Sequence, residues 1–518
     1  MMLPIPESSL SKPEQLIQAQ GRLSAMSPVA VIDIGSNSVR LVVYEGATRS
    51  PAPLFNEKVL CGLGRSVAAT GRLEGESVDR ALEALNRFQA ISGQLGAGKP
   101  WILATAAIRE ATNGEKFIRE AEKICGAKVL LLSGQREAEL AAAGIMSAFE
   151  MPDGIAGDLG GGSLELIDLA GAKLKNSTTL QLGGLRLLQR SGGDMAKAQR
   201  LIEQDFATVP WTSAGKGRTL FAVGGTWRNI AKLHMAEVDY PLRVTHGYQI
   251  SSEQAIRFCD FLARGKKLRV TSIDDVPSAR REVVPIGALV LKRLLEIINP
   301  KTLVFSVCGI REGLLYTLLG RNEQLRDPLL AFCQDYAILR SRSPVHAQEL
   351  CDWTDRLYQD GGPKESARER RLRHAACLIS DISWRTHPDY RGEQGLHLVA
   401  HATLNGIDHP GRAFLGMTIY FRHTGDDEHS EFGDRLLQLV DKGDLKHARI
   451  LGAAIRAVHM LSVGAAGIIS RTPVSYEGRR LVLQIPRELA ALNGERLRKR
   501  FATLAELLGS QPDIRIRK

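Results

Sequence analysis

Short apolar runs separated by polar turns characterise the chain from residue 29 onward. Val29 to Ile32 form a continuous apolar run, a polar turn follows from Asp33 to Ser38, and residues 39–44 are mainly apolar again. Two such runs joined by a turn rich in Gly, Ser and Asn are typical of paired β-strands. The pattern therefore predicts a hairpin with a polar tip.

Helical periods then alternate with further apolar runs. Val78, Leu82, Leu85 and Phe88 recur at the spacing of one helix face. After this helix we predict a strand over residues 101–105, a helix around residues 109–123 and a strand over residues 128–132. Strands that alternate with helices indicate an α/β layer architecture.

The hairpin is repeated later in the chain. Asp33-Ile34-Gly35-x-x-Ser38-Val39-x-Leu41 matches Asp158-Leu159-Gly160-x-x-Ser163-Leu164-x-Leu166 at each apolar and small position. Two further strand-turn-helix units are expected, with strands over residues 220–225 and 303–307. We interpret the repeat as an internal duplication that produces two similar α/β domains.

Beyond residue 320 the pattern becomes mainly helical, with many histidines and arginines. Two short apolar runs, over residues 474–476 and 481–485, predict one hairpin, and residues 511–518 are interpreted as a polar tail. The predicted segments are a flexible extension over residues 1–27, α/β domains over residues 28–140 and 141–320, and a helical C-terminal domain over residues 321–518.

Charge and composition narrow the function classes. The chain has 518 residues, of which 44% are hydrophobic, and a net charge of +11, which favours a polyanionic partner. Its seven cysteines include no CxxC pair, which indicates a reducing, cytoplasmic setting. No apolar stretch is long enough to cross a membrane, so we expect no membrane association.

Both hairpin tips suit a phosphate ligand. A turn of small residues lets backbone N–H groups approach phosphate oxygens, and an aspartate at its base can hold a cation. A single loop of this kind also occurs as an ordinary tight turn. Two loops from duplicated halves, each preceded by an aspartate, favour a clamp that grips consecutive phosphates.

Four motifs support a resemblance to a known family. The stretches Val31 to Ser38, Ala104 to Ala111, Leu132 to Ala138 and Asp158 to Leu166 resemble those of the Ppx/GppA phosphatases, in order and spacing. That resemblance implies two duplicated actin-like (ribonuclease H-like) domains with an interdomain cleft. It covers residues 29–320 well and is loose beyond them.

The resemblance also implies residue roles. Glu137 matches the general base that deprotonates the attacking water, although a helix glutamate in a first turn is commonly just solvated. Asp33, Asp158 and Glu165 match residues that hold a divalent cation, expected to be Mg²⁺. Phosphate contacts are expected from Gly35, Ser36, Asn37, Ser38, Arg109, Gly160, Gly161, Gly162 and Ser163.

Two further points concern Arg109 and a third glycine-containing loop. Arg109 is expected at a helix start, where an arginine is disfavoured by the helix dipole, and this favours a ligand role. Gly224, Gly225 and Thr226 resemble an adenosine-contacting loop of related kinases, and we expect them to be structural or peripheral, since a strand-to-helix turn favours glycine.

The C-terminal region resembles a degenerate HD phosphohydrolase domain. Leu372 to Leu378 resemble its signature helix, but the His-Asp metal pair is missing, so we predict no second active site. His374, His387, His397, His401 and His409 are interpreted as core or surface residues rather than metal ligands. Basic runs at residues 264–269, 368–373 and 496–500 are either a polyanion channel or solvated helix faces.

The leading hypothesis is hydrolysis of terminal phosphate from inorganic polyphosphate. Hydrolysis of guanosine pentaphosphate (pppGpp) is the alternative, and a kinase on the same fold or a non-catalytic polyanion binder are the others. Nucleic acid is not expected as a partner. The resemblance further implies a homodimer built with the C-terminal domain.

Overall fold

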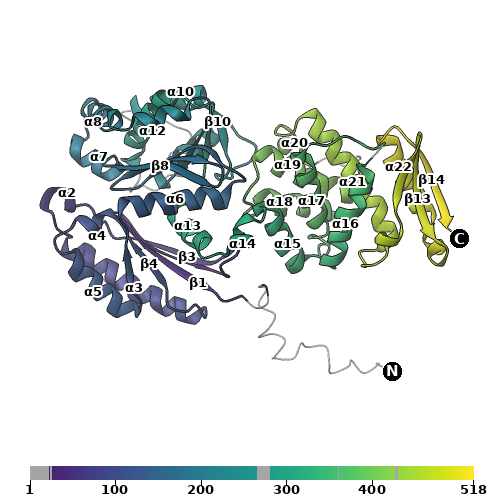
Figure 1. Ribbon diagram of the computed structural model, residues 1–518, viewed down its shortest axis with the longest axis horizontal. Helices are drawn as coiled ribbons and strands as arrows, with labels where there is room; N and C mark the ends of the chain where they lie inside the picture. Colours follow the sequence, from purple (N-terminus) through teal and green to yellow (C-terminus); the bar gives the residue numbers. More distant parts are fainter. Residues whose placement is uncertain (1–22, 24–25, 265–280, 360, 426–429, 518) are drawn as a thin grey trace.

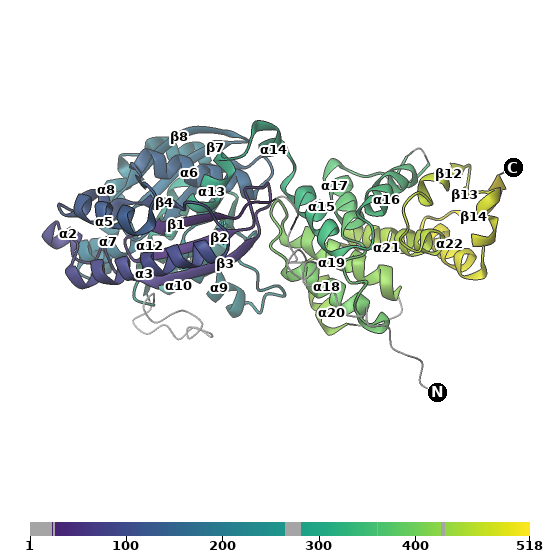
Figure 2. The same ribbon diagram turned by 90° about the horizontal axis from the view of Figure 1, so that it is seen from below.

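The computed structural model describes residues 23, 26–264, 281–359, 361–425 and 430–517, to which all structural statements refer. Most of the predicted extension over residues 1–27 lies outside the described residues, as do residues 265–269 of the first basic run. Figures 1 and 2 show an α/β part that contains two sheets, followed by a mainly helical part that ends in a small sheet. The predicted α/β architecture with two similar domains, followed by a mainly helical C-terminal region, is confirmed.

The first sheet has the strand order β3-β2-β1-β4-β5. Alternate residues of β1, such as Ala30 and Ile32, pack against helices on one face, while Val31 points to the other face. The elements are β1 (Val29–Ile34), β2 (Ser38–Tyr44), β3 (Pro53–Leu60), α2 (Val67–Thr70), α3 (Gly75–Gln94), β4 (Trp101–Ala104), α4 (Ala106–Glu110), α5 (Gly114–Cys125) and β5 (Val129–Leu131).

The second sheet has the order β10-β11-β9-β6-β7-β8 and repeats the path of the first. In each, a hairpin pairs antiparallel with an edge strand on one side and parallel with later strands on the other. The elements are β6 (Asp153–Leu159), β7 (Leu164–Ala170), β8 (Lys173–Leu180), α7 (Gly184–Ser191), α8 (Met195–Ala207), η1 (Pro210–Gly215), β9 (Thr219–Val223), α9 (Gly225–Glu237), β10 (Gln249–Ser251), α10 (Ser252–Arg264), α12 (Val284–Ile298) and β11 (Thr302–Phe305).

Two helices cross between the sheets. α6 (Gly134–Ala148) follows the first sheet but packs its alanine-rich face on the second, whereas α13 (Ile310–Thr317) follows the second sheet and packs Leu314 and Leu315 on the first. Gly313 lies so close to α6 that an added Cβ would stand 1.8 Å from the carbonyl oxygen of Leu140. The domain limit predicted at residue 140 falls inside α6.

The helical region forms one continuous core and carries a three-stranded sheet at its end. Residues 511–517, interpreted above as a polar tail, instead form a strand that pairs in parallel with β13, so that prediction was wrong. The elements are α14 (Arg321–Leu325), α15 (Pro328–Arg340), α16 (Pro344–Leu357), α17 (Ala367–Leu378), η3 (Pro388–Tyr390), α18 (Arg391–His401), α19 (His409–Thr424), α20 (Glu431–Leu437), α21 (Lys442–Ser462), η4 (Ile469–Arg471), β12 (Val474–Glu477), β13 (Arg480–Pro486), η5 (Arg487–Leu492), α22 (Glu495–Leu507) and β14 (Gln511–Arg517).

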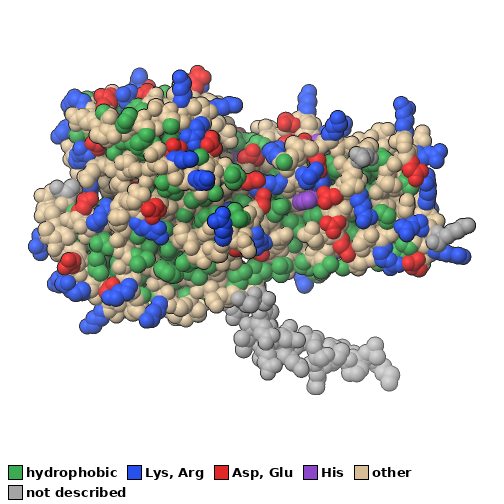
Figure 3. Space-filling model, viewed as in Figure 1, with side chains coloured by type: hydrophobic (Ala, Val, Ile, Leu, Met, Phe, Trp, Pro, Cys, Tyr) green, Lys and Arg blue, Asp and Glu red, His purple; other side chains and the backbone are tan. Residues whose placement is uncertain are grey.

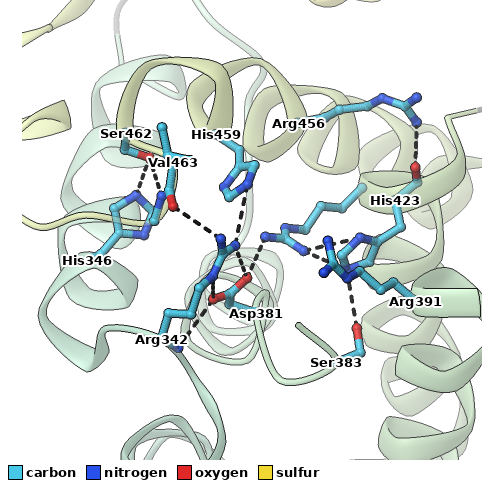
Figure 4. Close-up of polar contacts among 12 residues, drawn as sticks. Arg342, His346, Asp381, Ser383, Arg391, His423, Arg456, His459, Ser462 and Val463 are labelled. Atoms are coloured by element: carbon cyan, nitrogen blue, oxygen red, sulfur yellow. Dashed lines mark hydrogen bonds and ion pairs between the residues drawn. The ribbon is translucent and has the colours of Figure 1, made fainter. Parts of the chain in front are cut away.

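A buried polar network lies in the middle of this region (Figure 4). Both oxygens of Asp381 accept hydrogen bonds from Arg342, at 2.7 and 2.8 Å, and Arg422 donates to the same carboxylate at 2.8 Å. His459 Nε2 lies 3.4 Å from Arg342 Nη2, and His346 Nε2 lies 2.7 Å from Ser462 Oγ at the edge of the network. The described residues contain no group of three His, Cys, Asp or Glu side chains arranged to hold a metal ion.

None of the described helices is both long enough and apolar enough to cross a bilayer. On the face drawn in Figure 3, Lys and Arg side chains are scattered over both parts of the molecule. On that face they do not gather into one continuous basic track.

Candidate active site

The tips of the two duplicated hairpins line the same cleft. Each tip is closed by the same backbone hydrogen bond, from Gly35 N–H to the Ser38 carbonyl and from Gly160 N–H to the Ser163 carbonyl, both at 3.0 Å. The tips are close neighbours, because a Cβ added to Gly162 would lie 3.1 Å from Ser36 Oγ. All eight predicted loop residues line this cleft, so the structure brings them together.

Strand register explains the charges at the base of each tip. Asp33 of β1 stands opposite Arg40 of β2, and Asp158 of β6 stands opposite Glu165 of β7 at the equivalent position. The duplicated hairpins thus present an aspartate with an arginine on one side of the cleft, and an aspartate with a glutamate on the other. Arg40 also lines the cleft and was missed by the sequence analysis.

Glu137 lies in the first turn of α6 and reaches the cleft from between the two sheets. Ser133 caps this helix by accepting a hydrogen bond from Arg136 N–H at 3.2 Å, which fixes the first turn. The Glu137 side chain is 8% exposed and pairs with Arg109 at 2.6 Å. Glu137 is therefore not a solvated surface residue.

Arg109 differs from its prediction. Residues 109–123 do not form one helix, because α4 ends at Glu110 and α5 begins at Gly114, and Arg109 lies in the last turn of α4. The argument that an arginine is unfavourable at this position was wrong, since a helix C-terminus favours a cation. Its guanidinium contacts Glu137 and the carbonyl of Leu132, and it is not among the residues that line the cleft.

Three carboxyl groups near the cleft floor bind protons more tightly than usual. Burial raises the pKa of Glu137 to about 7, with further upward contributions from Asp158 and Asp33, although Arg109 acts in the opposite direction. Burial likewise raises the pKa of Asp158 to about 6. Burial together with the negative charges of Glu137 and Asp158 raises the pKa of Glu165 well above its usual range.

These carboxylates fit a bound cation. Within the described chain, the buried Glu165 Oε1 has no hydrogen-bond partner, and a buried oxygen of this kind is costly unless it is paired. Oxygen donors are the ligands that Mg²⁺ prefers, and Mg²⁺ commonly takes only one or two carboxylates from the protein. Among the described residues, Asp33, Asp158 and Glu165 do not converge as a three-carboxylate cluster, and Asp33 is already paired with Arg311. Asp158 and Glu165, which stand opposite each other on β6 and β7, are the carboxylate pair compatible with such an ion.

Arg311 is a second cleft residue that the sequence analysis missed. It is the second residue of α13 and donates from Nη1 to Asp33 Oδ2 at 2.6 Å. Its positive charge also lowers the pKa of Asp158 against the larger effect of burial. Lys58 and Arg228 line the cleft as well, as do Gly224, Gly225 and Thr226, which were expected to be structural or peripheral.

Comparison with known proteins agrees with this architecture. A family profile described as "Ppx/GppA phosphatase family" matches residues 27–322, which include both sheets and the whole cleft. The chain belongs to the Ppx/GppA phosphatase family. A second profile, described as "Exopolyphosphatase, C-terminal", matches residues 329–514 of this Ppx/GppA chain.

Individual relatives of this Ppx/GppA protein are distant. Retrograde regulation protein 2 of Saccharomyces cerevisiae is 25% identical over 452 residues, which cover 79% of this chain and 75% of the yeast protein. The crystal structure of an exopolyphosphatase-like protein has a TM-score of 0.50 at 25% identity and covers 57% of this chain and 98% of its own. An exopolyphosphatase from Cytophaga hutchinsonii has a TM-score of 0.51 at 24% identity, with 56% and 97% of the two chains covered, and supports the fold.

Proposed function

We propose that this chain is an exopolyphosphatase, which hydrolyses the terminal phosphate of inorganic polyphosphate with water activated by Glu137. One observation carries the proposal. A buried carboxylate, whose pKa is raised to about 7, stands beside two facing phosphate-type loops. A base with a pKa near the working pH is partly deprotonated and still strong enough to accept a proton.

The two loops bind the end of the substrate. Gly35, Ser36, Asn37 and Ser38 offer N–H and hydroxyl donors from one side, and residues 160–163 offer them from the other. Arg40 and Arg311 add positive charge along the cleft, and Arg109 supplies a further guanidinium near Glu137. Charged donors of this kind stabilise phosphate oxygens as charge develops on them.

We propose that Asp33, Asp158 and Glu165 would hold a divalent cation, Mg²⁺, with one or two of these carboxylates as direct ligands, because the described residues contain no three-carboxylate cluster. When bound, this ion neutralises phosphate charge. Within the protein, the orphaned oxygen of Glu165 and the raised pKa of Asp158 support the assignment.

The reaction needs one base and a water molecule. Glu137 accepts a proton from the water molecule. At the same time the water oxygen attacks the terminal phosphorus, in line with the P–O bond that breaks. The terminal P–O bond breaks, and its electron pair goes to the shortened chain, which leaves as a phosphate anion. No covalent enzyme intermediate is needed.

Two other candidates share the same cleft. The 5′-phosphate of pppGpp presents the same kind of terminal group, so hydrolysis of this alarmone is the first alternative. A non-catalytic polyanion binder is the second, and the name of the yeast relative, a regulation protein, states no catalytic activity. The first alternative releases phosphate from pppGpp rather than from polyphosphate. The second binds a polyanion without releasing phosphate.

The proposal also covers the location, the oligomeric state and the domain limits of the protein. All seven cysteines are free and buried, which supports a reducing, cytoplasmic location. We further propose a homodimer that involves the C-terminal domain, and the limits 28–140, 141–320 and 321–518 for the three structured domains.

Phosphate release from long polyphosphate, short polyphosphate and pppGpp, measured side by side, tests the function. Glu137→Ala should reduce release at least about 1000-fold, while polyphosphate affinity stays near that of the wild type. Glu139→Ala is the matched control, because Glu139 lies on the same helix but pairs with Arg136 at the surface. Activity retained in Glu137→Ala, or binding without turnover in the wild type, would contradict the proposal.

A further inference from the structure

A chain of polar contacts joins the two sheets behind the cleft. The hydroxyl of Tyr44, on β2, donates to Glu312 Oε1 at 2.6 Å, and the Gly309 N–H donates to Glu312 Oε2 at 2.8 Å. The neighbouring Arg311 extends from the same turn of α13 to Asp33 at 2.6 Å. Tyr44 and Asp33 belong to the first sheet, whereas Glu312 and Arg311 enter from the end of the second.

Glu312 is fully engaged in these contacts. Burial acts to raise its pKa, but the charge of Arg311 and the donors Gly309 N–H and Tyr44 hydroxyl outweigh burial and lower it, so the group is ionised. Arg311 Nε lies 3.9 Å from Glu312 Oε1, which places the glutamate alongside the guanidinium. Two hydrogen bonds, from Tyr44 and Gly309, thus fix the orientation of this carboxylate, and its charge attracts the Arg311 guanidinium beside it without a direct hydrogen bond to Nε.

We propose that Glu312 and Tyr44 are positioning residues for the phosphate cleft, and that together they fix the direction in which Arg311 points. Arg311 lines the cleft beside Asp33, so its guanidinium faces the substrate only when the helix start is held in this place. The inference rests on the proposed function, because it takes the ligand to be a phosphate chain. Glu312 and Tyr44 themselves act through Arg311.

Helix capping is the competing explanation. A glutamate three residues into a helix commonly accepts a hydrogen bond from the N-cap N–H, as Glu312 does from Gly309. The Tyr44 contact separates the two explanations, since it comes from the opposite sheet and adds nothing to the cap. Tyr44→Phe removes this contact and leaves the cap intact.

The test compares Tyr44→Phe, Glu312→Gln and the double variant with the wild type. Affinity for polyphosphate of defined length is measured by calorimetry in a Glu137→Ala background, and KM and kcat in the native background. We expect the dissociation constant and KM to rise about threefold to tenfold in each single variant, with kcat within about twofold. The double variant should lose less than the product of the single effects, since both changes release the same arginine.

Tyr316→Phe is the matched control. Tyr316 lies on the same helix and donates to the Gln324 carbonyl at 3.3 Å, away from Arg311, so its removal should leave affinity unchanged. Unchanged affinity in Tyr44→Phe and Glu312→Gln, with only a lower melting temperature, would overturn the proposal in favour of simple capping. A wild-type chain that binds polyphosphate without releasing phosphate refutes the proposed function, yet the affinities still decide this inference. A wild-type chain that binds no polyphosphate overturns both.

Discussion

Glu137 is held in a buried ion pair with Arg109, and this pair controls when the residue can act as a base. The arginine favours the carboxylate form, whereas burial and the neighbouring aspartates favour the protonated form. Burial has the larger effect, and the pKa settles near 7. The group is therefore poised close to neutral pH.

The pH dependence of phosphate release follows from this balance. Glu137 acts as a base only when deprotonated, so the rate should fall as pH drops through about 7, by about tenfold for each further pH unit. In Arg109→Gln the group that lowers the pKa is missing, so this acidic limb should move to higher pH. Initial rates measured between pH 5.5 and 9 give the acidic limb of the wild type and that of Arg109→Gln.

Arg136→Gln serves as the control, because Arg136 lies one residue before Glu137 but pairs with the exposed Glu139. Its acidic limb should coincide with that of the wild type. An Arg109→Gln profile that shifts to lower pH, or does not shift, would contradict the assignment of Glu137 as the base.

Cleft residues within local motifs could be predicted from the sequence, although Arg109 does not line the cleft, whereas cleft residues placed by long-range pairing could not be predicted. The loop residues and Glu137 lie within short patterns whose local geometry decides their position. Arg40 could not be selected from the sequence, because its importance comes from standing opposite Asp33 in the strand register. Arg311 meets Asp33 across 278 residues of chain, and no local signal marks such a contact.

At the scale of elements, the contact between α6 and α13 determines how the cleft is built. α6 carries Glu137 and α13 carries Arg311, and glycines allow the two helices to touch. A Cβ on Gly144 would meet the Gly309 carbonyl oxygen at 2.4 Å, and one on Gly313 would meet the Leu140 carbonyl oxygen at 1.8 Å. Backbone atoms cannot yield as a flexible side chain can.

Gly313→Ala should therefore force the helices apart. Overpacking of this kind costs about 1–3 kcal/mol in the free energy of unfolding, and the displaced helices should also lower kcat/KM. Gly320→Ala is the control, since no atom lies within 4 Å of a Cβ at that position. Chemical denaturation and phosphate release are measured on both variants, and equal effects of the two substitutions would contradict the role given to this contact.

Two element predictions failed because tertiary contacts overrode local pattern. The expected helix over residues 109–123 is interrupted where the Asn113 side chain exchanges hydrogen bonds with the backbone of Leu73, at 2.8 and 3.0 Å. The supposed tail became β14 because it pairs with β13 along its whole length. Neither partner is near in sequence, whereas the hairpins and the α/β order were predictable from local periodicity.

At the scale of the whole molecule, buried and partly buried histidines of the helical region link stability to pH. Burial lowers the pKa of His346 and of His409 to about 4, and of His459 to about 3, with nearby arginines acting in the same direction. In the unfolded chain each would titrate near 6.5. The unfolded state thus binds more protons than the folded state below that pH.

Stability should accordingly be complete above about pH 6.5 and decline on acidification. His346 and His409 alone should each remove about 1.4 kcal/mol between pH 8 and pH 5.5. Melting temperatures and denaturant midpoints at the two pH values measure the loss, and His346→Gln should make the dependence shallower. His387→Gln, at an exposed position, should leave it unchanged. Equal stability at pH 8 and pH 5.5 would contradict this account.

The exchange of α6 and α13 between the sheets has a consequence for dissecting the protein. A fragment that ends at residue 140 keeps the first sheet but lacks the helix that covers its inner face, and the complementary fragment lacks half of α6. Neither piece can bury its own apolar surface, so each should be insoluble when expressed alone. Only co-expression of the two pieces should restore a folded, assembled pair.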